Sequence, residues 1–181
     1  MNIKEQQERF LRLLEPLNDQ LFLYARALER NKQDAEDLVS ETILKCYEYF
    51  PNIKDESAFK GYLFIVARNI FRKKYRRSLL FGKFDDSFAE NIPDNNSSPD
   101  LPIDIAFLYQ ALDKLPAKQK ESIVLFDISG FSLNEIKEIQ GGTLSAVKSR
   151  LKRGRERLIE ILNPEKSYQK FNFSNKAIVE L

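Results

Sequence analysis

Two clusters of basic side chains are the residues of this 181-residue chain best suited to bind a charged partner. Six of the ten residues from Arg68 to Arg77 are Lys or Arg, and so are six of the ten from Lys148 to Arg157. Between the clusters, the segment 84–104 holds six Asp and Glu and no Lys or Arg. Although the formal net charge is only +2, this distribution indicates a polyanion that is bound at two places.

The side chains on which most enzymes and metal sites depend are scarce. The chain has no His and a single Cys, Cys46, and it lacks a glycine loop of the kind that cradles phosphates. We therefore expect no catalytic residue, no metal and no cofactor. No apolar run approaches the length of a membrane span and the segment after Met1 is charged, so we expect a cytoplasmic protein without membrane insertion.

Composition divides the chain into two parts. Only 6 Gly and 7 Pro are present, which favours long helices over a turn-rich β fold, and the expected fold class is all-α. Pro, Asn, Ser and Asp crowd the stretch before residue 103. We expect two small helical domains, 8–80 and 103–163, joined by a flexible acidic linker over 81–102, with a C-terminal tail over 164–181.

Apolar residues at three- and four-residue steps predict helices in the N-terminal part, beginning with one amphipathic face from Phe10 to Tyr24. Asp34 is predicted to cap a second helix, and Ser57 a third helix that runs from Ala58 to about Arg77. On the third helix, five residues are predicted to share a broad face: Tyr62, Ile65, Val66, Asn69 and Ile70.

The C-terminal part has the pattern of a helix-turn-helix. Ser132 and Glu135 have the spacing of a capping box before a short helix, and Gly141-Gly142 predicts a sharp turn after it. The last helix has an apolar stripe with basic residues on its free face; the stripe is Val147, Leu151, Gly154, Leu158 and Ile161. A run of charge is often only a solvated face, but the short helix and tight turn before this run favour DNA binding.

These segments resemble a known family. Leu115–Glu121, Gly130–Ile136 and Val147–Leu158 together resemble domain 4 of bacterial sigma factors of the extracytoplasmic-function group. Asp34–Thr42 resembles the sigma domain 2 segment that docks on the clamp helices of the polymerase β′ subunit, and Phe59–Asn69 resembles the helix that holds the melted −10 element. The resemblance covers both expected domains in their order.

The resemblance implies a sigma factor that binds core RNA polymerase, through the β′ clamp helices and the β subunit, and directs recognition and melting of promoter DNA. A cognate anti-sigma factor is a further expected partner. The implied contacts to the −35 element are Thr143, Lys148, Ser149, Lys152 and Arg153. Those to the −10 element are Arg68, Asn69, Lys73 and Arg76, and those to the polymerase are Asp34, Asp37 and Glu41.

The main alternative is a helix-turn-helix transcriptional regulator that binds duplex DNA without sigma activity. Such a regulator usually dimerises to read a symmetric site, and it needs no surface for core polymerase. An enzyme that uses only Asp and Glu is a more distant alternative, because no carboxylate pair stands out from the helical pattern. The acidic run from Asp34 to Glu41 and the helical Asn69 also have plain structural interpretations, as a solvated face and a tolerated polar residue.

Overall fold

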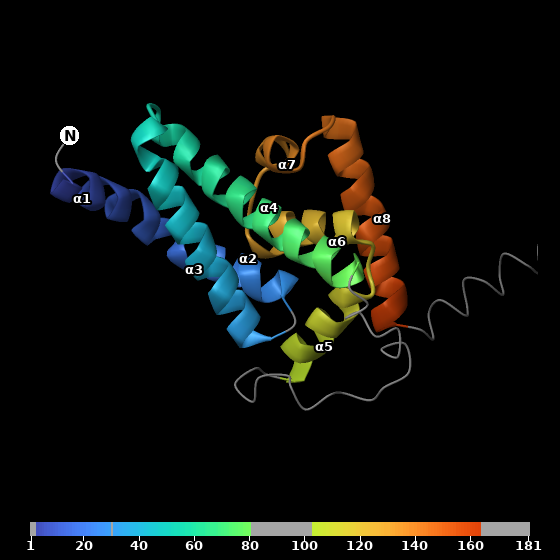
Figure 1. The fold of residues 1–181 in the computed structure, drawn as a ribbon. Coiled ribbons are helices and arrows are strands. Elements are labelled where there is room, and N and C mark those ends of the chain that lie inside the picture. The colour runs from blue at the N-terminus through green and yellow to red at the C-terminus, as the bar shows by residue number, and fades with distance from the viewer. Residues whose placement is uncertain (1–2, 30, 81–102, 164–181) are drawn as a thin grey trace, which may run out of the picture.

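The computed structural model describes residues 3–29, 31–80 and 103–163, and these ranges contain helices and no β-strand (Figure 1). The expected all-α class is confirmed. The expected linker over 81–102 and tail over 164–181 lie outside the described residues. The longer helices are α1 (Ile3–Leu14), α2 (Asn18–Leu28), α3 (Lys32–Tyr49), α4 (Phe59–Leu80), α5 (Ile103–Asp113), α6 (Ala117–Ile123), α7 (Leu133–Gln140) and α8 (Leu144–Leu162). The shorter turns are η1 (Glu15–Leu17), η2 (Phe50–Asn52), η3 (Glu56–Ala58) and the π-helical η5 (Val124–Ile128).

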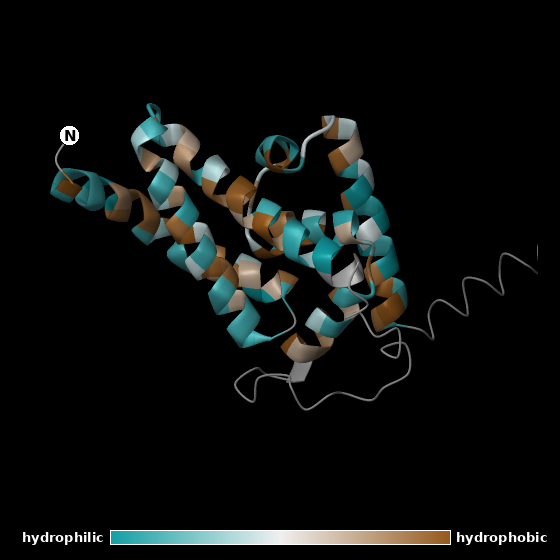
Figure 2. Ribbon diagram, in the orientation of Figure 1, coloured by the Kyte–Doolittle hydropathy of each residue, from teal (hydrophilic) through white to brown (hydrophobic). Residues whose placement is uncertain are grey.

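The amphipathic face predicted from Phe10 to Tyr24 is divided between two helices. Pro16 has no backbone N–H to donate, and around it the chain forms η1 between α1 and α2. Phe10 and Tyr24 are nevertheless both buried, because the two helices turn their apolar sides to the same core. Figure 2 shows the result along the chain, with hydrophobic segments alternating with hydrophilic ones on each helix.

Local side chains determine where the helices begin. Asn31 caps α3 by accepting a hydrogen bond from the Asp34 N–H at 2.8 Å, so the prediction that Asp34 is the cap is wrong. Asp55, and not Ser57, caps η3 before α4, with 2.9 Å from the Ser57 nitrogen to the Asp55 carboxylate. Both errors arise because Asn, Asp and Ser are all favourable caps, so that near neighbours compete.

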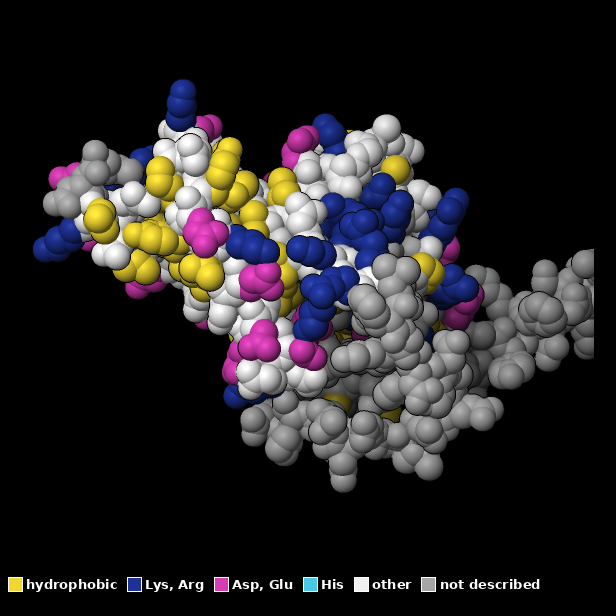
Figure 3. Space-filling view, in the orientation of Figure 1, with side chains coloured by type: hydrophobic (Ala, Val, Ile, Leu, Met, Phe, Trp, Pro, Cys, Tyr) yellow, Lys and Arg dark blue, Asp and Glu magenta, His cyan; other side chains and the backbone are white. Residues whose placement is uncertain are grey.

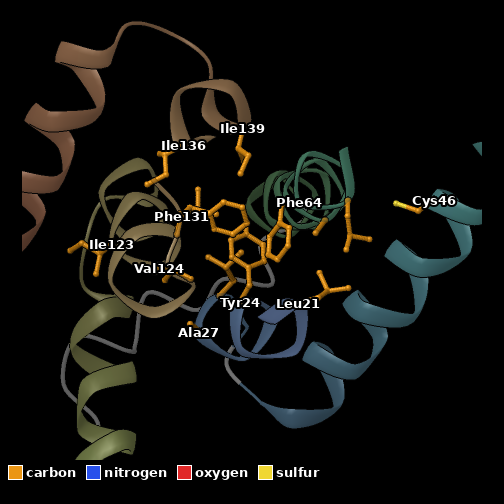
Figure 4. Close-up of a cluster of buried hydrophobic side chains, with 14 of the residues drawn as sticks. Leu21, Tyr24, Ala27, Cys46, Phe64, Ile123, Val124, Phe131, Ile136 and Ile139 are labelled. Carbon is orange, nitrogen blue, oxygen red and sulfur yellow. The ribbon is translucent and has the colours of Figure 1, made fainter. Parts of the chain in front are cut away.

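A single hydrophobic core spans the two halves of the chain. Phe64 of α4 packs against both Tyr24 of α2 and Phe131, which precedes α7 (Figure 4). The ring centroids of Phe64 and Tyr24 are 5.3 Å apart, and those of Phe64 and Phe131 are 4.5 Å apart. Since all three side chains are buried, the N-terminal helices and the helix-turn-helix pack as one body in this structure.

Helix α4 is enclosed from two directions, by α3 and by α7. Of the face predicted for it, only Ile70 is buried; Asn69 is exposed, and Tyr62, Ile65 and Val66 are half-buried. The buried residues are instead Phe59, Leu63, Phe64, Ala67, Arg68 and Ile70. Tyr62, Ile65 and Val66 nevertheless pack against the core, so the predicted face departs from the structure mainly at the exposed Asn69. Because α4 packs on two sides, its buried residues do not form a single apolar stripe.

Candidate nucleic-acid interface

The turn between α7 and α8 is built from local hydrogen bonds and two glycines. Ser132 and Glu135 form the expected capping box at the start of α7, with 2.8 Å between the Ser132 nitrogen and the Glu135 carboxylate. Gly141 and Gly142 have φ values of 75° and 98°, which residues other than glycine rarely adopt. Thr143 then caps α8 by accepting a hydrogen bond from the Ala146 N–H at 3.2 Å. The predicted helix-turn-helix is confirmed.

One side of α8 is held against α6. Val147, Leu151 and Gly154 are buried. Gly154 allows a close approach, since a Cβ atom at this position would lie 2.9 Å from the Cδ1 atom of Ile123. The buried stripe fixes the rotation of α8 and turns its opposite side outward.

The outward side of α8 carries unpaired cations. Lys148, Lys152 and Arg153 are exposed, and none of them has a hydrogen-bond or ion-pair partner among the described residues. Ser149 is half-buried beside them, and the exposed Thr143 accepts the capping hydrogen bond through its hydroxyl oxygen. Figure 3 shows Lys and Arg side chains gathered over α8 and the nearby end of α4.

Two other arginines of the same basic cluster have structural partners. Arg150 donates to the Gln140 side-chain oxygen at 2.6 Å, which ties α8 to the end of α7. Arg155 donates to Asp127 at 2.5 Å and lies over the ring of Phe126, 5.1 Å from its centroid. The cluster that looks uniform in sequence thus divides into cations that position the helix and cations that are free to bind.

The second basic cluster divides in the same way. Asn69, Lys73 and Arg76 are exposed on α4, at steps of four and three residues that place them along one side of the helix. Lys74 instead donates to Asp34 at 2.7 Å and to Glu29 at 3.2 Å. The predicted −10 residues Asn69, Lys73 and Arg76 are therefore brought together at the surface.

Arg68, the fourth predicted −10 residue, is buried between α4 and the helix-turn-helix. Its Nε donates to the Glu121 carboxylate at 2.6 Å, and only 11% of the Arg68 side chain and 7% of the Glu121 side chain are exposed. The Nη2 atom of Arg68 donates to the Gln140 backbone carbonyl at 3.3 Å. Burial raises the pKa of Glu121, and the charge of Arg68 acts against that rise. In this arrangement Arg68 has no access to a nucleic acid.

The acidic residues of α3 also differ in their freedom. Asp34 is bound by Lys74 and by the Asn31 side chain; burial acts to raise its pKa, but these hydrogen bonds outweigh it and lower the pKa. Asp37 and Glu41 are exposed and point away from the core. Their hydrogen bonds are local, from Gln33 and Lys45 one turn away.

A groove between α1 and α3 was not anticipated from the sequence. It has a volume of about 650 Å³ and is lined mainly by apolar side chains: Phe10, Leu11, Ile43, Leu44 and Tyr47, with Gln7 and Ser40. Leu11 and Leu44 are 59% and 58% exposed, and Figure 3 shows hydrophobic side chains over these helices. In the sequence, a spacing of six residues places Leu44 on a different side of α3 from the buried Leu38. This position of an apolar residue is a sequence signal for the groove.

Within the described ranges, no group of three or more His, Cys, Asp or Glu side chains is placed to hold a metal ion. No described helix is both long enough and apolar enough to cross a membrane. The buried thiol of Cys46 has its pKa raised to about 12 by burial.

Comparison with known families matches both parts of the chain. Residues 13–79 match the family model of sigma-70 region 2, and residues 108–158 match that of sigma-70 region 4. The first match contains α3, which forms one side of the groove, and all of α4 except its last residue, and the second contains α7 and α8 as far as Leu158.

Individual relatives agree with these matches. The chain is 34% identical to the ECF RNA polymerase sigma factor EcfG of Rhodopseudomonas palustris over 142 residues, 77% of each protein. It is 33% identical to the ECF RNA polymerase sigma factor SigE of Mycolicibacterium smegmatis over 150 residues, 80% of this chain and 58% of that protein. Its fold is similar to the sigma factor RpoE solved in complex with the anti-sigma factor NepR from Bartonella quintana, with a TM-score of 0.69 and 30% identity over 89% of this chain and 98% of that one.

Proposed function

The chain belongs to the sigma-70 family, in its extracytoplasmic-function group, and from this premise we propose which surfaces carry out promoter recognition. It is a sigma factor, and its role is in transcription initiation. We propose that it binds core RNA polymerase in the cytoplasm and catalyses no reaction itself. The observation that carries the assignment of surfaces is the set of unpaired cations on the exposed side of α8, away from the buried stripe that holds this helix in place.

We propose that α8 enters the major groove of the −35 element. Residues near the start of a recognition helix reach base edges, and later ones meet phosphates. Lys148 and Lys152 lie one turn apart on the exposed side and have no partner among the described residues, so they are free to donate to bases. Ser149 and Arg153 lie beside them, while Thr143 contributes through the cap that positions the helix.

The test of this assignment is the sequence dependence of binding. Lys148→Ala or Lys152→Ala should lower the preference for the −35 sequence over a scrambled duplex, by about 1–3 kcal/mol for a lost base contact. Arg157→Ala, an exposed cation near the end of α8, is the matched control and should weaken both duplexes equally or neither. If Lys148→Ala weakens both duplexes equally in fluorescence anisotropy titrations, Lys148 contacts phosphate and the assignment is wrong.

We propose that α4 holds one strand of the melted −10 element. Opening a duplex costs a few kcal/mol for each extruded base, and cations and polar side chains along one side of a helix can hold the freed strand. Asn69, Lys73 and Arg76 provide such a side, with an amide that both donates to and accepts from a base edge.

We propose that core polymerase docks on α3. Asp37 and Glu41 are exposed and make only local hydrogen bonds, and the apolar α1–α3 groove lies beside them on the same helix. Asp34 accepts a hydrogen bond from Lys74, and this contact holds α3 against α4 at one end of the proposed docking surface. An anti-sigma factor is a further proposed partner, supported by the similar fold of a sigma factor solved with NepR.

A further inference from the structure

Polar contacts from α2 and α4 join the region 2 match to the region 4 match. Arg68 pairs with Glu121, Lys60 donates to Glu135 at 3.1 Å, and the Nζ of Lys120 donates to the Leu28 carbonyl at 2.9 Å. In addition, the Gln20 amide donates to the Ser129 carbonyl. The two matched regions are therefore joined by specific hydrogen bonds as well as by the shared core.

Arg68 and Glu121 form the most enclosed of these contacts. Both side chains are almost completely buried, and Gln140 completes the network by donating to the second Glu121 oxygen at 2.9 Å. Removing water from two charges is costly, and their attraction recovers this cost only when the geometry is good. Such a pair holds two surfaces in one specific arrangement but adds little net attraction, which suits an interface that opens.

The interface also contains a buried polar group without a hydrogen-bond partner among the described residues. Tyr24 is completely buried, yet its hydroxyl has no hydrogen-bond partner among the described residues. Burial, and next the nearby charge of Glu121, raise the pKa of Tyr24, so the hydroxyl lies close to the Arg68–Glu121 pair. A buried hydroxyl without a partner opposes the closed arrangement. The closed form therefore carries this penalty, while the Arg68–Glu121 pair fixes its specific arrangement.

We propose that the Arg68–Glu121 pair is a latch that keeps the two regions closed and withholds Arg68 from DNA until a phosphate replaces the Glu121 carboxylate. This inference rests on the proposed role of α4 in holding the −10 strand. A guanidinium donates equally well to carboxylate and phosphate oxygens, so a phosphate can take the place of Glu121 on the Arg68 Nε. The exposed row of Asn69, Lys73 and Arg76 offers the first contact, and Arg68 joins it only after the regions separate.

Three variants of the full chain test the latch. Glu121→Gln keeps the shape of the side chain and removes its charge, so the ratio of open to closed molecules should rise about tenfold or more. Tyr24→Phe removes the unpaired hydroxyl and should shift the same ratio towards the closed form. Asp127→Asn is the matched control, since Asp127 is exposed, pairs with Arg155 within the helix-turn-helix and does not touch α4.

Energy transfer between dyes on α3 and α8 measures the ratio. The exposed positions Glu48 and Glu160 can be changed to Cys and labelled, because the native Cys46 is buried. We expect efficient transfer in wild type and Asp127→Asn and reduced transfer in Glu121→Gln. The circular dichroism melting curve of each variant shows whether the helices stay folded. Unchanged transfer in a folded Glu121→Gln protein would overturn the latch.

Binding of a random-sequence single-stranded DNA oligonucleotide measures access to Arg68. Glu121→Gln should bind it about tenfold more tightly than wild type, since the cost of opening is reduced. Adding Arg68→Gln to Glu121→Gln should abolish the gain. If Glu121→Gln opens the protein but does not tighten DNA binding, the gating of Arg68 is overturned. If changing Asn69, Lys73 or Arg76 to Ala also leaves binding of the oligonucleotide unchanged, the proposed role of α4 fails as well. Failure of the latch alone is therefore distinguishable from failure of the proposed role of α4.

Discussion

The contact between Phe64 and Phe131 reports whether the two sigma regions fold as one body in the free protein. Both rings are buried, with centroids 4.5 Å apart and planes inclined at 70°. Edge-to-face pairs of this kind contribute about 0.5–1.5 kcal/mol beyond the burial of their area. The pair joins α4 to the segment that leads into α7, so this coupling energy exists only while the regions are packed together.

A double-mutant cycle measures the coupling directly. Truncation of both residues to Ala, at about 3–5 kcal/mol each, would approach the whole stability of a typical domain, so each Phe is changed to Leu. Each single variant should lose about 0.5–3 kcal/mol of unfolding free energy in urea titrations, and the double variant less than the sum, by about 0.5–1.5 kcal/mol. Phe107→Leu, at a residue 57% exposed, is the control and should change stability by at most about 0.5 kcal/mol. Strict additivity of Phe64→Leu and Phe131→Leu would refute the shared core.

Three further predictions follow from the exposed and buried groups. Asn69→Ala should reduce permanganate reactivity of promoter thymines, because an unpaired base edge costs about 1–3 kcal/mol, and a pre-melted bubble should rescue part of the loss; full melting by the variant would make Asn69 structural. Reversing Asp37 and Glu41 to Lys should weaken core binding in a fluorescence titration without changing the melting temperature. The control Glu160→Lys should leave both core binding and the melting temperature unchanged. Cys46, with its pKa raised to about 12 by burial, should react with a thiol reagent at neutral pH only as fast as the protein unfolds; rapid reaction in the native state would contradict its burial.

Features that depend on nearby residues could be predicted from the sequence, and several were. The capping box of Ser132 and Glu135, the turn at Gly141 and Gly142 and the apolar stripe of α8 are all encoded within a few residues. Even so, local signals gave errors of two or three residues at the starts of α3 and η3, because several good caps stand close together.

Features that depend on distant residues could not be predicted. Arg68 is separated from Glu121 by 53 positions, and nothing around Arg68 distinguishes it from the exposed cations that follow it. The same holds for Lys74, whose partner Asp34 lies 40 positions earlier. The sequence therefore predicts where the basic clusters are, while the packing of the two regions decides which cations are free.

The central claim is that this chain directs promoter-specific initiation through two cationic surfaces, and transcription with purified core polymerase tests it most directly. Wild type added to core polymerase should give transcripts with defined start sites. Lys148→Ala should reduce initiation at promoters with the intact −35 element, and Asn69→Ala should reduce it on duplex promoters more than on pre-melted ones. Binding to duplex DNA with no initiation by core polymerase in any of these reactions would contradict the account and favour a regulator without sigma activity.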